Sequence, residues 1–74
     1  MPTVPTLPIQ IIVNGESRSV SEGATLLAVL LELGIEPDRV AVEKDLAIVR
    51  KAEWGNTTVQ AGARLEIVQF VGGG

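Results

Sequence analysis

Residues 9–20 read IQIIVNGESRSV, and this stretch decides the fold. Residues 9–13 form a β-branched, aliphatic run of the kind found in strands, and Asn14-Gly15 directly after it is the strongest short signal for a tight hairpin turn. The chain is therefore expected to turn back through a second strand over residues 16–20. An antiparallel hairpin is the first predicted unit of the protein.

One helix is predicted after this hairpin. Ser21-Glu22-Gly23 interrupts the second strand, and the hydroxyl of Thr25 can cap the start of a helix. Gly34 stands where a left-handed C-terminal cap belongs, and Pro37 prevents the helix from continuing. The helix is expected to present one wide apolar face, formed by Leu26, Leu27, Leu30, Leu31 and Leu33.

Short strands make up the rest of the chain. Residues 40–43 and 47–49 are predicted to be a third and a fourth strand, residues 52–54 a brief helical turn, and residues 64–70 the last strand. A single helix across one face of a mixed sheet of four or five strands satisfies this order, with the first and last strands central and parallel. The predicted fold class is α+β, the ubiquitin-like β-grasp.

Composition narrows the possible functions. The chain has 74 residues, enough for one small domain, and it has neither cysteine nor histidine. This composition excludes a disulfide and a thiolate metal site, and it leaves only carboxylates, amines and guanidinium groups for chemistry. We expect no metal, no catalytic residue and no bound cofactor. The net charge of −3 argues against nucleic acid as a partner. Because no apolar run approaches about 18 residues and the start lacks the pattern of a signal peptide, we expect a cytoplasmic protein that does not span a membrane.

Proline and glycine mark the two ends of the expected domain. Residues 1–8 hold three of the four prolines and are expected to be a disordered lead-in. Residues 9–71 are expected to form the β-grasp domain. Residues 72–74 are three glycines, which lose the most backbone entropy on ordering, so we expect a flexible tail.

The glycine tail is the most informative functional feature of the sequence. Gly72 and Gly73 have no Cβ, so this part of the chain can thread through a channel too narrow for other residues. The last four residues reach about 13–14 Å beyond Phe70 when they are extended. The tail can therefore carry the carboxylate of Gly74 into the active site of a partner. A plain disordered end is the alternative interpretation.

Alternation along the last strand separates two apolar surfaces. Leu65 and Ile67 share one face, while Val68 and Phe70 share the other. If the helix covers the first pair, the second pair is exposed on the open face of the sheet just before the tail. Exposed apolar patches on small proteins tend to mark interfaces, so we expect Val68 and Phe70, together with Ile12, to contact partner enzymes. A covering loop is the alternative.

Simpler roles are expected for the other prominent side chains. Trp54 is expected to cover an edge of the core rather than to bind a partner. Lys44 and Lys51 show no sign of burial and are poor candidates for catalysis. The acidic residues are expected to form a solvated face, although they could steer a basic partner toward the chain. They are Glu32, Glu36, Asp38 and Glu43.

Several short motifs follow one another in a fixed order along the chain. They are Val13-Asn14-Gly15-Glu16, Thr25-Leu26-Leu27, Val40-Ala41-Val42, Ile48-Val49 followed by Glu53-Trp54, and the ending from Glu66 to Gly74. Each motif is weak alone, but the VNGE hairpin, the EW pair and the FVGGG ending form a specific signal at these separations. With them, residues 9–74 resemble the thiamine-biosynthesis sulfur carrier proteins, the ThiS family.

The sequence departs from the family pattern in four places. Asp45-Leu46 stands where members often have Asn-Gly, and Leu46 is expected to resist a positive φ, which predicts a different type of turn. Arg50 replaces a frequent proline, Ala63 replaces a frequent aspartate, and the proline-rich lead-in is additional. None of these departures affects the tail.

The resemblance implies that Gly74 carries sulfur. A ThiF-type adenylyltransferase would use ATP and Mg²⁺ to adenylate its carboxylate. Sulfur from a cysteine desulfurase or a rhodanese would then displace AMP and leave a terminal thiocarboxylate. A ThiG-type thiazole synthase would take that sulfur to build the thiazole ring of thiamine. The chain itself would be a protein cosubstrate rather than an enzyme, and a monomer when free.

Fold and tail together leave other functions open. The same tail chemistry would serve a carrier for molybdopterin synthesis. A ubiquitin-like interaction module, or a tag that forms isopeptide bonds with lysines, belongs to a different class. A nucleic-acid-binding β-grasp domain is the third possibility, which the acidic balance of the chain disfavours.

Overall fold

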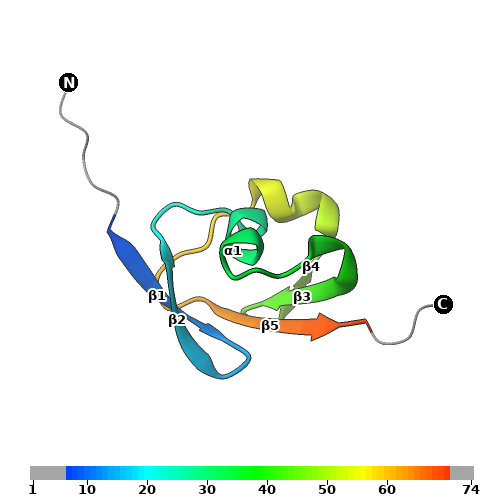
Figure 1. The fold of residues 1–74 in the computed structure, drawn as a ribbon, viewed down its shortest axis with the longest axis horizontal. Coiled ribbons are helices and arrows are strands. Elements are labelled where there is room, and N and C mark those ends of the chain that lie inside the picture. Colours follow the sequence, from blue (N-terminus) through cyan, green and yellow to red (C-terminus); the bar gives the residue numbers. More distant parts are fainter. Residues whose placement is uncertain (1–6, 71–74) are drawn as a thin grey trace.

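Five strands and three helical segments follow one another in the computed structural model, which describes residues 7–70 (Figure 1). The lead-in up to residue 6 and the glycine tail lie outside the described residues. The elements are β1 (Pro8–Val13), β2 (Glu16–Ser21), α1 (Leu26–Glu32), η1 (Pro37–Arg39), β3 (Val40–Lys44), β4 (Ala47–Val49), η2 (Lys51–Asn56) and β5 (Arg64–Gln69), where η denotes a 3-10 helix.

The five strands form one mixed sheet in the order β2-β1-β5-β3-β4. β1 and β5 are parallel and central, with Ile12 opposite Arg64 and Val13 opposite Leu65. All other neighbours are antiparallel. This confirms the predicted fold, with five strands. β1 begins at Pro8, one residue earlier than expected, since the first residue of a strand is a position where proline is tolerated.

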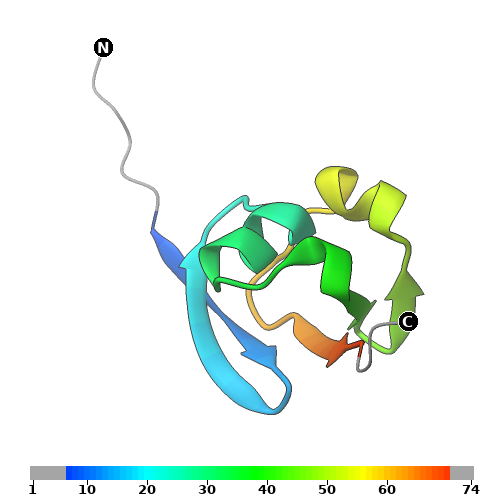
Figure 2. The same cartoon turned by 45° about the vertical axis from the view of Figure 1, so that its right-hand side comes forward.

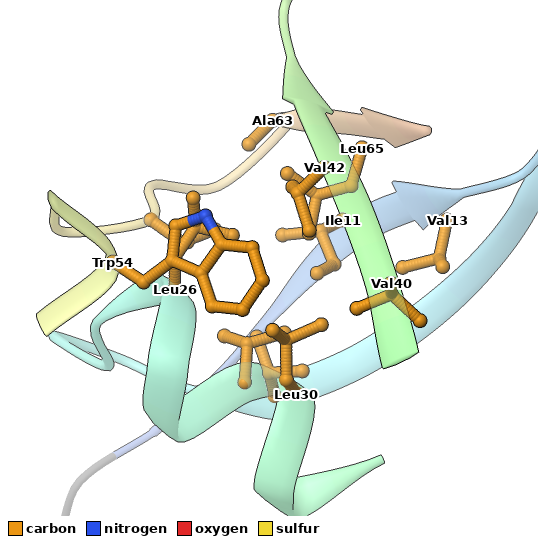
Figure 3. Close-up of a cluster of buried hydrophobic side chains, with 12 residues drawn as sticks. Ile11, Val13, Leu26, Leu30, Val40, Val42, Trp54, Ala63 and Leu65 are labelled. Carbon is orange, nitrogen blue, oxygen red and sulfur yellow. The ribbon is translucent and has the colours of Figure 1, made fainter. Parts of the chain in front are cut away.

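The core lies between α1 and one face of the sheet (Figures 1 and 2). Ile11, Leu30 and Leu65 are fully buried there. Trp54, carried by η2, is also buried among these side chains (Figure 3), and its Nε1 donates a hydrogen bond to the carbonyl of Val49 at 2.8 Å. Trp54 is therefore a structural residue, as expected, but it lies inside the core rather than at its edge.

Both ends of α1 are capped as the sequence predicts. The hydroxyl of Thr25 accepts a hydrogen bond from the backbone N–H of Ala28 at 3.2 Å. Gly34 adopts a φ of 75°, and the N–H of Ile35 donates to the carbonyl of Leu30 at 2.8 Å. This is the Schellman motif, which needs a left-handed residue after the helix and so favours glycine.

The apolar face of α1 is narrower than predicted. Leu26, Val29 and Leu30 are buried, whereas Leu31 is 60% exposed. At about 100° per residue, Leu31 lies roughly 140° around the helix from Leu26 and therefore points away from the sheet. The expectation that Leu31 joins the core face was wrong, and Val29, which was not included, takes a place in the core.

Both strand hairpins turn through two residues with positive φ. Asn14 and Gly15 have φ values of 50° and 84°, and Asp45 and Leu46 have values of 50° and 73°. Positive φ at both central positions is the property of a type I′ turn, whose twist matches that of the flanking strands. The prediction that Leu46 would resist this conformation was wrong, because the two-residue connection between β3 and β4 imposes it.

Leu46 should therefore carry backbone strain that substitution can remove. Its side chain is 85% exposed, so little packing offsets the cost of the left-handed conformation. Leu46→Gly is expected to raise the free energy of unfolding by about 0.5–1 kcal/mol, after allowance for the greater freedom of glycine in the unfolded chain. Leu46→Ala keeps the Cβ and is the matched control, with no gain expected. Urea unfolding measures both, and an equal effect of the two variants would contradict the strain.

Candidate partner-binding site on the open face of the sheet

β5 is the element that leads toward the glycine tail, and the last described residue, Phe70, is hydrogen-bonded to the end of η1, just before β3. The N–H of Phe70 donates to the carbonyl of Arg39 at 2.7 Å. Gly72, Gly73 and Gly74 lie outside the described residues, so their role stays a prediction. The structure defines the position of Phe70, two residues before the first glycine of the tail.

Asn14 holds the middle of β5 from the side of β1. Direct pairing of β1 with β5 ends at Val13 and Leu65, and the N–H of Asn14 donates to the carbonyl of Leu65 at 2.9 Å. Beyond that point the side-chain amide of Asn14 makes the hydrogen bonds to β5 that a backbone peptide group of β1 would otherwise make. Its Nδ2 donates to the carbonyl of Ile67 at 3.1 Å, and its Oδ1 accepts from the N–H of Ile67 at 2.7 Å. The turn residue therefore extends the ladder toward the tail.

Asp45 holds the start of β5 from the side of β3. Its N–H donates to the carbonyl of Arg64 at 2.8 Å, and its Oδ1 accepts from the N–H of Arg64 at 3.0 Å. The hydrogen bond from Arg64, followed by one from the Lys44 ammonium, lowers the pKa of the Asp45 carboxyl below its ordinary value. The first residue of each hairpin turn thus binds the same strand, one from either side.

The face of the sheet opposite α1 carries an apolar patch, which we call the open-face patch. It consists of Ala41, Ile48, Val68 and Phe70. Val68 is 62% exposed, Phe70 60% and Ile48 78%, and Ala41 lies directly opposite Val68 in the pairing of β3 with β5. The predicted exposure of Val68 and Phe70 is confirmed. No segment within residues 7–70 covers them, so the covering-loop alternative does not hold for this range.

Ile12, the third predicted interface residue, lies apart from this patch. It is half-buried and sits opposite Arg64, four residues before Val68 along β5, which is about 13 Å along the strand. The patch instead includes Ile48, which was not among the predicted interface residues. All three residues of β4 are apolar, so no alternation in the sequence distinguishes the two faces of that strand.

Most of the expected solvated acids make local contacts. Glu36 pairs with Arg39 at 2.9 Å, and Asp38 pairs with Lys51. Glu32 accepts a hydrogen bond from the N–H of Ser21 at 3.1 Å. Glu43 differs from them because it is half-buried and lies on the open face.

The described part of the chain contains neither a candidate metal site nor a membrane-spanning helix. No group of three or more acidic side chains in residues 7–70 gathers closely enough to hold a metal ion. None of the helices in the same range is long and apolar enough to cross a membrane. What the described residues offer is an exposed apolar patch at the base of a tail, a geometry suited to docking on another protein.

A β-grasp sheet with an open apolar face beside the strand that leads to a glycine ending is the architecture of the ubiquitin-like carrier proteins. The model of the ThiS family matches residues 11–74, and the chain belongs to this family of sulfur carriers.

Solved structures agree with this assignment. The crystal structure of the thiamine biosynthesis protein ThiS from Geobacter metallireducens superposes with a TM-score of 0.78 at 28% identity, over 89% of this chain and all of that one. The solution structure of the same Geobacter metallireducens protein gives a TM-score of 0.74 at 28% identity, over 89% of this chain and 88% of that one.

Curated relatives are much longer proteins. The chain is 44% identical over 66 residues to a thiazole synthase of Paramagnetospirillum magneticum and 38% identical over 66 residues to a thiazole synthase of Magnetococcus marinus. In both cases the match covers 89% of this chain and 20% of the relative. The chain therefore spans about one fifth of the length of these relatives.

The side chain of Asn14 should stabilise β5 at Ile67, in the middle of the strand. Asn14→Gly keeps the freedom to adopt positive φ but removes both hydrogen bonds to Ile67, so it isolates the contribution of the amide. We expect a loss of about 1–3 kcal/mol in the free energy of unfolding. Faster hydrogen exchange at the Ile67 amide is expected as well. Unchanged exchange at Ile67 would show that these bonds do not hold β5 in solution.

Proposed function

We propose that this chain carries sulfur as a thiocarboxylate on Gly74 and delivers it for the construction of the thiazole ring of thiamine. The observation that carries the proposal is the match to the ThiS family, which runs through the glycine tail to residue 74. The thiamine biosynthesis protein of Geobacter metallireducens, which has the same fold in both of its solved structures, supports the same pathway.

Chemistry at the carboxylate requires activation by a partner. A free carboxylate is ionised at pH 7, and its charge repels nucleophiles. A ThiF-type adenylyltransferase using ATP and Mg²⁺ would convert it to an acyl adenylate with release of pyrophosphate, which removes the charge. A persulfide of a cysteine desulfurase or a rhodanese would then form the C–S bond as the C–O bond to AMP breaks. A thiol would cleave the S–S bond of the resulting acyl disulfide, which leaves the thiocarboxylate on the carrier and a disulfide between the thiol and the sulfur donor. With no histidine or cysteine in the chain, the partners would supply the catalytic groups.

A ThiG-type thiazole synthase is the proposed acceptor of the sulfur. Two thiazole synthases contain a segment similar to this chain within a polypeptide about five times as long, which supports physical association of the two activities. The open-face patch is the proposed docking surface, since Phe70 lies only two residues before the first glycine of the tail. A partner that binds the patch would hold the tail close to its own active site.

Maleimide labelling tests the sulfur chemistry directly. The chain is incubated with the adenylyltransferase, ATP and a sulfide source, and is then alkylated and mapped by mass spectrometry. Because the chain has no cysteine, a stable adduct is expected only on the terminal peptide, at a new thiocarboxylate of Gly74. Omission of ATP should abolish the adduct. No adduct, with the enzyme active on another carrier, would contradict the proposal.

Phe70→Ala tests the docking surface. We expect binding to the partner enzymes to weaken about tenfold or more, as is usual for an aromatic residue in the centre of an interface. Leu31→Ala is the matched control, because Leu31 is equally exposed but lies on the helix, away from the open face. Calorimetry gives the affinities and thermal unfolding verifies the fold. Equal affinities of the two variants would rule out the open-face patch as the docking surface.

A further inference from the structure

A small hollow lies on the open face next to the exposed apolar side chains. Its volume is about 120 Å³, and it is lined by Ala41, Val42, Glu43, Ile48, Glu66 and Val68. Its lining is therefore aliphatic except for two carboxylates. Both carboxylates belong to neighbouring strands in the centre of the sheet, on the face where the partner is proposed to dock.

Glu43 and Glu66 are directly opposite each other in the pairing of β3 with β5. Like charges in opposite positions destabilise a sheet, since their Cβ atoms are only about 5 Å apart. Neither carboxylate forms an ion pair with any residue in the range 7–70. Lys44 is engaged with Asp45 instead, and Arg64, two residues before Glu66 on the same face, forms no ion pair with either glutamate. Within residues 7–70 the two carboxylates therefore lie opposite each other without an ion-pair partner.

We propose that this hollow receives an arginine side chain of the enzyme that docks on the open face. The aliphatic stem of the arginine would lie against Ile48 and Val68, as long cationic side chains commonly do on apolar surfaces. Its planar guanidinium has five donors and can serve the carboxylates of Glu43 and Glu66 together, whereas the compact ammonium of lysine acts as a point charge. The inference rests on the proposed docking and specifies its chemistry.

The test compares two carriers with the same net charge. Glu43→Gln combined with Glu66→Gln keeps the shape of the hollow and removes its charge. Glu22→Gln combined with Glu53→Gln is the control, because these exposed glutamates lie outside the hollow and form no ion pair in the described residues. Calorimetric affinities for the adenylyltransferase and for thiazole synthase are measured at low and at physiological salt.

The variant that combines Glu43→Gln with Glu66→Gln, called the hollow variant, is expected to bind at least one of the two enzymes about tenfold or more weakly. The affinity of the control variant is expected to change by less than about threefold. Its melting temperature should stay the same or rise, because the repulsion between Glu43 and Glu66 is removed. Phenylglyoxal modification of the enzyme, mapped by mass spectrometry, should show an arginine that the unmodified carrier protects and the hollow variant does not.

Several outcomes would overturn the inference. If Phe70→Ala abolishes binding and the hollow variant binds as tightly as the unmodified carrier, docking on the open face is supported. The proposed role of the hollow is then contradicted. If neither change matters, or the unmodified carrier binds neither enzyme, the proposed docking falls as well. Equal losses of affinity in the hollow variant and the control variant would indicate that the enzymes respond to the net charge of the carrier rather than to the hollow. Protection of a lysine rather than an arginine, or self-association of the carrier that the hollow variant loses, would assign the hollow to another occupant.

Discussion

The two hydrogen bonds between the side chain of Asn14 and the backbone of Ile67 are the constraint on which the geometry of this protein depends. Direct parallel pairing of β1 with β5 comprises only two opposite residue pairs. The amide adds a third point of attachment further along β5, while Asp45 fixes the start of the same strand from the other side. Each hairpin turn thus does more than reverse the chain, because it also binds the strand from which the tail emerges.

The two faces of the sheet differ in how much apolar surface they bury. One face is covered by α1 and Trp54 and forms the core. A domain this small buries a limited share of its surface, so each exposed apolar side chain leaves less for the core. The other nonetheless exposes Ile48, Val68 and Phe70. On that face the exposed large apolar side chains lie on β4 and at the end of β5 that precedes the tail.

Local patterns in the sequence predicted what depends on local chemistry. Thr25 and Gly34 capped the helix as expected, and alternation along β5 placed Val68 and Phe70 on the open face. Features set by pairing between distant strands could not be predicted in this way. Glu43 and Glu66 are 23 positions apart and become neighbours only through the register of β3 with β5. The bonds of Asn14 to Ile67 likewise follow from tertiary geometry. The positive φ of Leu46 follows from the two-residue connection between β3 and β4, which overrides the preference of the single residue.

A single exposed face beside a single tail has a kinetic consequence under the proposed function. The activating enzyme and the sulfur acceptor would compete for the same surface, so one carrier molecule cannot serve both at once. Each cycle would include a complete release from the first enzyme before the second can bind. Since differences in affinity between related complexes reside mostly in the dissociation rate, very tight binding would slow the flow of sulfur. Selection on such a surface would favour short residence times, and a moderate patch of four apolar side chains suits brief encounters better than a large interface would.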